Sequence, residues 1–154
     1  MTRTITPAPV RRSVTVKATR ERAWAVFTHD IGLWWPRTHH IGATAMKTAT
    51  IEPKAGGRWY ETGEDGSECP WGEVLTWEPP SRLVLVWRIG GDFTYDPILH
   101  TEVEVVFTET ADGVRVDLEH RHLERMGATE ERARAAFESP NGWGGLLALF
   151  AAAV

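Results

Sequence analysis

WGEVLTWEPPSRLVLVW, residues 71–87, decides the fold, because two apolar runs flank a Pro-Pro-Ser turn at 79–81. Val, Leu and Trp suit a pleated, half-buried surface. Proline cannot donate a hydrogen bond to a strand ladder, so strand pairing stops there and the chain turns. The stretch therefore predicts an antiparallel hairpin near the middle of a sheet. The side chains on both faces of its second strand are largely apolar, which indicates that other parts of the protein pack against both faces.

The composition narrows the classes of protein. The 154 residues include 17 Lys plus Arg and 21 Asp plus Glu, and the net charge of −4 offers no general attraction to nucleic acid or to an anionic membrane. No apolar run approaches the roughly 20 residues of a membrane span, and residues 1–7 lack the apolar core of a signal peptide. A single cysteine, Cys69, cannot form an internal disulfide. We therefore expect a cytoplasmic protein without a nucleic-acid or membrane partner.

Alternating apolar residues and helix-capping residues predict further strands and helices before and after the hairpin. Residues 1–10 show little apolar pattern and predict a loose lead-in, and residues 11–18 alternate as a half-buried strand. Thr19 is a helix-capping residue followed by an apolar stripe at helical spacing. Further strands are predicted at 48–53 and 58–62, before the hairpin, and at 101–108 and 114–121, after it.

An apolar helix ends the chain. Ser139-Pro140 combines a cap residue with proline at a first helical position, and apolar side chains repeat at helical spacing from Trp143 to Val154. A shorter helix is predicted from Glu130 to about Phe137. A sheet with one apolar face needs a cover, and the terminal helix is long and apolar enough. We predict an α+β fold in which a curved antiparallel sheet of six to seven strands wraps around a long C-terminal helix, in one domain over residues 11–154.

Several segments together resemble a known family. They are Gly56-Gly57-Arg58-Trp59, Trp71-Gly72-Glu73-Val74, Trp77-Glu78-Pro79-Pro80-Ser81-Arg82-Leu83, Trp87, the strand 101–107, Gly113-Val114-Arg115-Val116, and Gly142-Trp143. With these segments the chain, from about Ser13 to Val154, resembles the activator of heat-shock protein 90 ATPase homologue family of the START-like superfamily, also called SRPBCC or Bet v 1-like. The resemblance implies a helix-grip fold with a deep apolar cavity between sheet and terminal helix. It implies no single activity, since members include carriers of hydrophobic ligands, polyketide cyclases and chaperone activators.

Trp residues are the first candidates for a binding site, because there are eight of them and Trp often lines cavities and interfaces. Ordinary core packing is the alternative, since a core between sheet and helix needs bulky side chains anyway. His120 joins the candidates because it shares the inward face of its strand with Val116 and Leu118, and an imidazole could orient the polar end of a ligand. The predicted ligand-binding residues are Trp34, Trp35, Trp77, Trp87, Phe107, His120, Trp143, Leu147 and Phe150.

Other polar residues are weaker candidates. His120 and His122 could face one metal ion, but the spacing shows no third ligand, so we predict no metal and no cofactor. Glu73 would be a general base if it faced inward; the alternatives are a β-bulge at Gly72-Glu73 that turns it outward, or a salt bridge to Arg58 or Arg88. Cys69 is interpreted as an inert thiol. His39-His40 is interpreted as part of a solvated connector, and no residue is predicted to be catalytic.

The sequence thus predicts that a small hydrophobic or aromatic molecule binds in an apolar cavity, without a committed reaction. A cyclase- or hydrolase-like enzyme using the same cavity, through His120 and Glu73, is a second hypothesis. A domain that activates a chaperone ATPase is a third, and it rests on the resemblance alone. A homodimer and a chaperone or other protein partner are left open.

Overall fold

Alternating apolar and polar residues form the strands of one antiparallel sheet. The computed structural model describes residues 8–154. Its seven strands lie in the spatial order β1-β7-β6-β5-β4-β3-β2, so each strand from β2 to β6 pairs with the next in sequence and β1 pairs with β7. The strands are β1 (Val10–Val16), β2 (Met46–Ile51), β3 (Arg58–Gly63), β4 (Glu68–Glu78), β5 (Arg82–Trp87), β6 (Thr101–Thr110) and β7 (Gly113–Arg121). The hairpin predicted at 71–87 is β4–β5.

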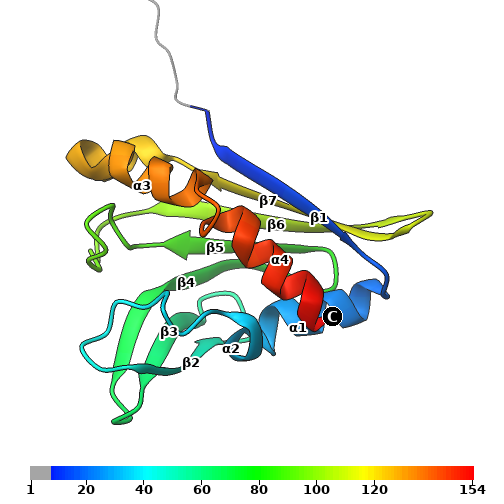
Figure 1. The fold of residues 1–154 in the computed structure, drawn as a ribbon, viewed down its shortest axis with the longest axis horizontal. Coiled ribbons are helices and arrows are strands. Elements are labelled where there is room, and N and C mark those ends of the chain that lie inside the picture. The colour runs from blue at the N-terminus through cyan, green and yellow to red at the C-terminus, as the bar shows by residue number, and fades with distance from the viewer. Residues whose placement is uncertain (1–7) are drawn as a thin grey trace, which may run out of the picture.

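The helices gather at the two ends of the sheet and across one of its faces (Figure 1). They are α1 (Arg20–Thr28), α2 (Ile31–Trp34), the 3-10 helix η1 (Leu123–Thr129), α3 (Glu130–Glu138) and α4 (Trp143–Ala153). Thr19 caps α1 as expected, because its hydroxyl accepts a hydrogen bond from Arg22 N at 3.1 Å. Among residues 8–154, no helix combines the length and the apolar character that crossing a membrane requires. Residues 1–7 of the predicted lead-in lie outside the described residues.

The concave face of the sheet holds α4, so the predicted helix-grip fold is confirmed. Inward side chains of β6 and β7, such as Phe107 and Leu118, are buried beneath it. Phe150 of α4 packs on Phe27 of α1 and Trp34 of α2, with ring centroids 5.3 Å and 5.7 Å apart. This half of the space between sheet and helix is therefore filled by aromatic rings.

Irregular pairing bends the sheet around the helix. The register shifts between Trp59 and Tyr60 on β3 and between Val74 and Thr76 on β4, and such bulges increase local twist and bending. Gly72 lies within this bend, where a Cβ atom would come 1.7 Å from Val86 O. Only glycine allows β4 and β5 to approach so closely.

The last helix begins later than the sequence signal predicted. Ser139-Pro140 was expected to start it, but α4 begins at Trp143 with Gly142 at its N-cap. The reason is that the Ser139 hydroxyl donates to Ala136 O at 2.7 Å and so ends α3 instead. Residues 139–142 form a short connection between the two helices, and this connection borders the cavity described next.

Candidate functional site

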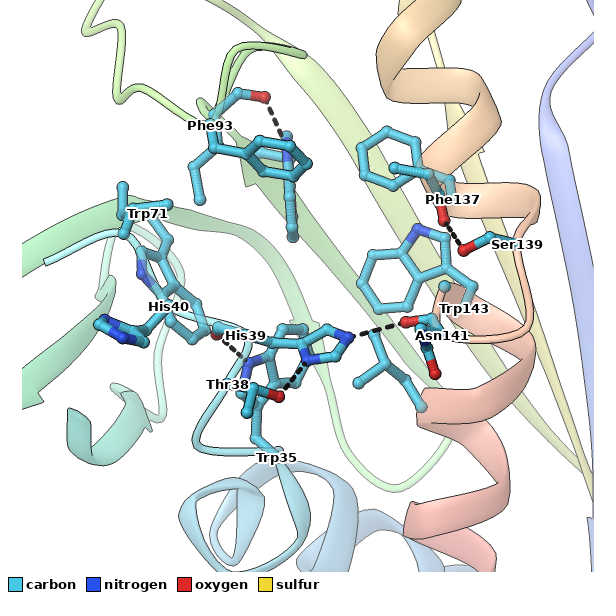
Figure 2. Close-up of a pocket in the computed structure, with 16 residues that line it drawn as sticks. Trp35, Thr38, His39, His40, Trp71, Phe93, Phe137, Ser139, Asn141 and Trp143 are labelled. Atoms are coloured by element: carbon cyan, nitrogen blue, oxygen red, sulfur yellow. Dashed lines mark hydrogen bonds between the residues drawn. The ribbon is translucent and has the colours of Figure 1, made fainter. Parts of the chain in front are cut away.

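A cavity of about 400 Å³ opens at one end of the space between sheet and helix. Its walls come from the segment before β2, from β4 and β5, from the β5–β6 loop, and from the junction of α3 with α4 (Figure 2). Aromatic side chains dominate these walls, and the polar groups come from two loops. The lining residues are Trp35, Thr38, His39, His40, Ile41, Trp71, Trp87, Ile89, Phe93, Ala136, Phe137, Ser139, Asn141, Gly142, Trp143 and Leu146.

The aromatic walls support one another. Trp35 packs on Trp71 and on Trp143, with centroids 5.2 Å and 6.0 Å apart. Trp87 packs on Trp143 at 5.7 Å and on Phe137 at 5.5 Å. Most of these pairs are tilted or edge-to-face, which is a favourable arrangement for aromatic rings. The four indole rings are therefore held in place without a ligand.

Each of these four indole N–H groups also has a hydrogen-bond acceptor. Trp35 Nε1 donates to His39 O at 2.8 Å, and Trp87 Nε1 donates to Ile89 O at 2.7 Å. Trp71 Nε1 donates to the Glu61 carboxylate at 2.9 Å, and Trp143 Nε1 donates to His120 Nδ1 at 3.1 Å. A buried N–H without a partner would be costly. Because these groups are satisfied by the protein, the cavity presents mainly ring carbon to a ligand.

His120 of β7 lies behind the cavity wall and is hydrogen-bonded to it. It is fully buried, and its Nδ1 accepts the Trp143 bond, so the proton of the neutral ring is on Nε2. Nε2 lies 2.9 Å from Thr101 Oγ1, whose own hydroxyl donates to Trp87 O at 2.9 Å. Burial lowers the pKa of His120 from 6.5 to about 3. His120 is thus a neutral link between Trp143 and Trp87, with both nitrogens already used.

A buried carboxylate supports the opposite side of the cavity. Glu61 of β3 is 1% exposed. Its Oε1 accepts hydrogen bonds from Ile41 N at 2.7 Å, Gly42 N at 3.1 Å and the Trp71 indole. Its Oε2 lies 3.4 Å from His40 Nδ1 and, within residues 8–154, has no hydrogen-bond partner. Glu61 therefore fastens the 40–42 segment to the sheet and faces His40 with a free oxygen.

The mouth of the cavity is bridged by His39. Its Nε2 lies 2.8 Å from Asn141 O, and its Nδ1 lies 3.1 Å from Thr38 Oγ1 (Figure 2). A carbonyl can only accept, so the Nε2 proton makes the bond to Asn141. This bond ties the segment before β2 to the α3–α4 connection, two regions that are 102 residues apart in sequence.

Comparison with known proteins identifies the family. Residues 17–154 match the model of the family described as activator of Hsp90 ATPase homolog 1-like protein. The chain belongs to this family. No curated protein matches it.

Two solved structures of similar sequence carry functional names. The chain is 36% identical to an anthrahydroquino-γ-pyrone synthase, Txn09, over 97% of this chain and 98% of that one, with a TM-score of 0.67. It is 34% identical to CalC, a self-sacrificing resistance protein from Micromonospora echinospora, over 95% and 93% of the chains, with a TM-score of 0.71. An AHSA1-like protein from Aeromonas hydrophila, 18% identical over 94% and 90% with a TM-score of 0.61, shares the fold.

Some of the residues predicted to bind a ligand line the cavity, and the others lie elsewhere in the fold. Trp35, Trp87 and Trp143 line the cavity. His120 lies behind the wall, and Trp77 packs on Trp24 at 5.0 Å, away from the cavity. The remaining four belong to the hydrophobic core: Trp34, Phe107, Leu147 and Phe150. For the residues of α4, the division arises because this helix carries one apolar stripe along its length, while only its first turn lines the cavity.

The other polar candidates lie outside the cavity lining. Glu73 is paired with Arg88 at 2.8 Å, which matches the salt-bridge alternative. Burial, with a smaller effect of Glu61, raises the pKa of the Cys69 thiol, which disfavours the reactive thiolate. His122 lies in the turn after β7. Over residues 8–154, no three His, Cys, Asp or Glu side chains cluster as a metal site would require.

Sequence reasoning missed several residues that shape the site. Trp71 and Phe137 are wall residues that carried no distinguishing signal. Phe93, His39 and Asn141 lie in loops, where periodicity gives no information about direction. Glu61 carried a weak signal, because it alternates with Trp59 on a strand whose other face bears Tyr60.

Proposed function

We propose that this protein binds a small planar aromatic molecule in the cavity at the α3–α4 junction. The observation that carries the proposal is the set of four wall indoles, Trp35, Trp71, Trp87 and Trp143, whose N–H groups are satisfied by the protein, around about 400 Å³ of space. Small-molecule sites are typically about 300–1,000 Å³ and mainly apolar with few polar groups. Burial of apolar area at about 25 cal/mol per Å² drives binding, and ring stacking favours flat ligands.

One similar structure supports a polycyclic aromatic ligand, because it is named as an anthrahydroquino-γ-pyrone synthase. The other is named as a resistance protein, and that name specifies no ligand. A polar edge on such a ligand would meet the loop residues His39 and Asn141 at the mouth. Stimulation of a chaperone ATPase stays a prediction that rests on the family's name.

A pair of substitutions on α3 tests the binding proposal. Ala136 lines the cavity, and its neighbour Ala135 is exposed. Ala136→Trp would fill the cavity, whereas Ala135→Trp adds the same side chain to the surface. In a titration of quinizarin, a three-ring hydroxyanthraquinone, followed by quenching of Trp emission, we expect Ala136→Trp to weaken binding at least about tenfold, equivalent to roughly 1.4 kcal/mol. Ala135→Trp should stay within about twofold.

The proposal fails if wild-type protein neither quenches nor gains thermal stability with quinizarin or other flat aromatic probes. It also fails if both Trp variants bind as wild type does, because binding would then occur outside the cavity.

Proton transfer on the bound molecule is a second candidate function. One observation favours it: His40 lies at the cavity edge with Nδ1 3.4 Å from the free oxygen of buried Glu61, and an imidazole at that position could accept a proton from a bound molecule. The residues first considered for such a reaction are less suitable, because both nitrogens of His120 are hydrogen-bonded and Glu73 is paired with Arg88.

An anthrone, whose ring methylene protons are acidic, is a suitable probe for this chemistry. In D₂O, wild-type protein should accelerate exchange of these protons, and His40→Gln should abolish at least about 90% of the acceleration, in line with the usual contribution of a general base. His100→Gln replaces a histidine on the far side of the sheet and is the control. Equal exchange by wild type and His40→Gln would remove this candidate without affecting the binding proposal.

A further inference from the structure

The β5–β6 loop holds Phe93 in an unusual backbone conformation. Phe93 N donates to Gly90 O at 2.9 Å and Gly90 N donates to Thr94 O at 3.0 Å, so residues 91–93 form a tight loop above the Ile89–Tyr95 bridge. Phe93 has φ of 59°, in the left-handed region. Three-residue loops of this kind place their last residue in that region and strongly favour glycine there. A bulky side chain at such a φ is an outlier.

The two glycines of the loop do not take this position. A Cβ at Gly91 would come 2.0 Å from Thr129 O, and one at Gly90 would come 2.9 Å from Asp92 Oδ1. Those glycines allow the loop to lie close to the start of α3. The left-handed position, where glycine would relieve the backbone, is occupied by phenylalanine.

The Phe93 ring is stabilised little by packing against the rest of the protein. It is 58% exposed although it lines the cavity. The other aromatic walls pack against neighbouring rings, as Trp87 does against Phe137 and Trp143. Across residues 8–154, Phe93 takes part in no such ring pair. Figure 2 shows its ring reaching from the loop toward the Phe137 side of the cavity.

We infer that Phe93 is the residue that caps a bound aromatic ligand and selects flat rings over aliphatic chains. A disfavoured backbone conformation that supports an exposed, unpacked ring at a cavity mouth is expected where the ring serves a ligand and not the fold. The ligand's outer face would receive the Phe93 ring, while the indoles receive its inner face. This inference rests on the proposed binding function and adds a residue that determines specificity.

Three variants separate this role from a structural one. Phe93→Asn relieves the left-handed backbone and removes the ring, and Phe93→Leu keeps an apolar side chain without a flat face. His122→Asn is the control, because His122 also has a positive φ, of 65°, and it does not line the cavity. Each is compared with wild type for melting temperature and for affinity toward quinizarin and toward laurate, an aliphatic probe.

We expect Phe93→Asn to raise Tm by about 2 °C while weakening quinizarin binding at least about tenfold. Phe93→Leu should weaken quinizarin about as much and leave laurate binding within about twofold. His122→Asn should change neither affinity, whatever its effect on Tm. This pattern would show that the ring is maintained for the ligand at a cost to stability.

Other results overturn the inference in distinguishable ways. If wild type binds quinizarin and Phe93→Asn binds it equally well, Phe93 is not the cap, and the proposed function stands. If Phe93→Asn lowers Tm, the ring serves the fold. If wild type binds laurate but neither quinizarin nor another flat aromatic probe, the selection of flat rings and the proposed function are both wrong. If it binds none of these probes, the proposed function fails and this inference fails with it.

Discussion

His120 determines the cavity at the scale of single residues, although it does not line it. Its ring accepts a hydrogen bond from one indole wall and, through Thr101, is linked to the backbone of the strand that carries another. The ring also packs against Phe137, with centroids 4.5 Å apart. Sequence parity predicted that His120 points inward, which is true. Parity could not show that both its nitrogens would be used by neighbouring side chains.

The buried neutral state of His120 predicts a pH dependence of stability. Its pKa is about 3 in the folded protein, against 6.5 for an unperturbed ring. Between these values the unfolded chain binds a proton that the folded protein does not. The contribution of neutral His120 to the free energy of unfolding should therefore be complete above pH 6.5. It should decrease as the pH falls toward 3, by up to about 1.4 kcal/mol per pH unit.

His120→Gln isolates this contribution, because an amide can replace both hydrogen bonds but does not titrate. Urea unfolding of wild type and His120→Gln at about pH 7.5 and about pH 5.5 avoids most carboxylate titration. Wild type should lose about 1 kcal/mol more than the variant over this range. An equal loss in the two proteins would mean that His120 is protonated in the fold at the lower pH.

At the scale of helices and strands, two glycines are predicted to respond in opposite ways to substitution by alanine, because one lies in a crowded strand and the other is exposed on a helix. At Gly72 an added Cβ would meet Val86 O at 1.7 Å, so Gly72→Ala must push β4 away from β5. We expect a loss of roughly 2–3 kcal/mol in the free energy of unfolding. Gly144 is exposed in the first turn of α4, and its added Cβ would lie no closer than 3.7 Å to another residue. Gly144→Ala should stabilise by about 0.5–1 kcal/mol.

Urea denaturation midpoints of the two alanine variants provide the measurement. A small effect of Gly72→Ala would mean that the β4–β5 bend can relax, and the close approach would then not explain the glycine.

Elements were predictable where periodicity decides which face a residue occupies. The β4–β5 hairpin, the alternation along β7 and the apolar stripe of α4 were all predicted from residue spacing, and α3 was predicted from Glu130 to about Phe137. The start of α4 was misplaced, because Ser139 can bond either to the helix before it or to the helix after it, and the spacing does not distinguish these. Loop residues such as His39 and Phe93 were not assigned to the site, since their directions depend on contacts across the fold.

On the scale of the whole molecule, the space between sheet and helix has a filled half and an open half. Phe27, Phe107 and Phe150 fill the half beside α1 and α2. The open half lies where α4 begins, beside the connection at residues 139–142. The sequence predicted one apolar stripe facing one sheet. It could not predict where along that stripe the packing stops, because this depends on how the bulges bend β3 and β4.

The eight indoles form an almost continuous array. Trp35 and Trp87 connect Trp34, Trp59, Trp71 and Trp143 through direct ring pairs. Trp24 and Trp77 join them through Phe107 and Phe27. At such separations, an excited state created on one indole migrates rapidly to the others. A single molecule that accepts energy in the cavity would therefore quench nearly all the ultraviolet emission of the protein.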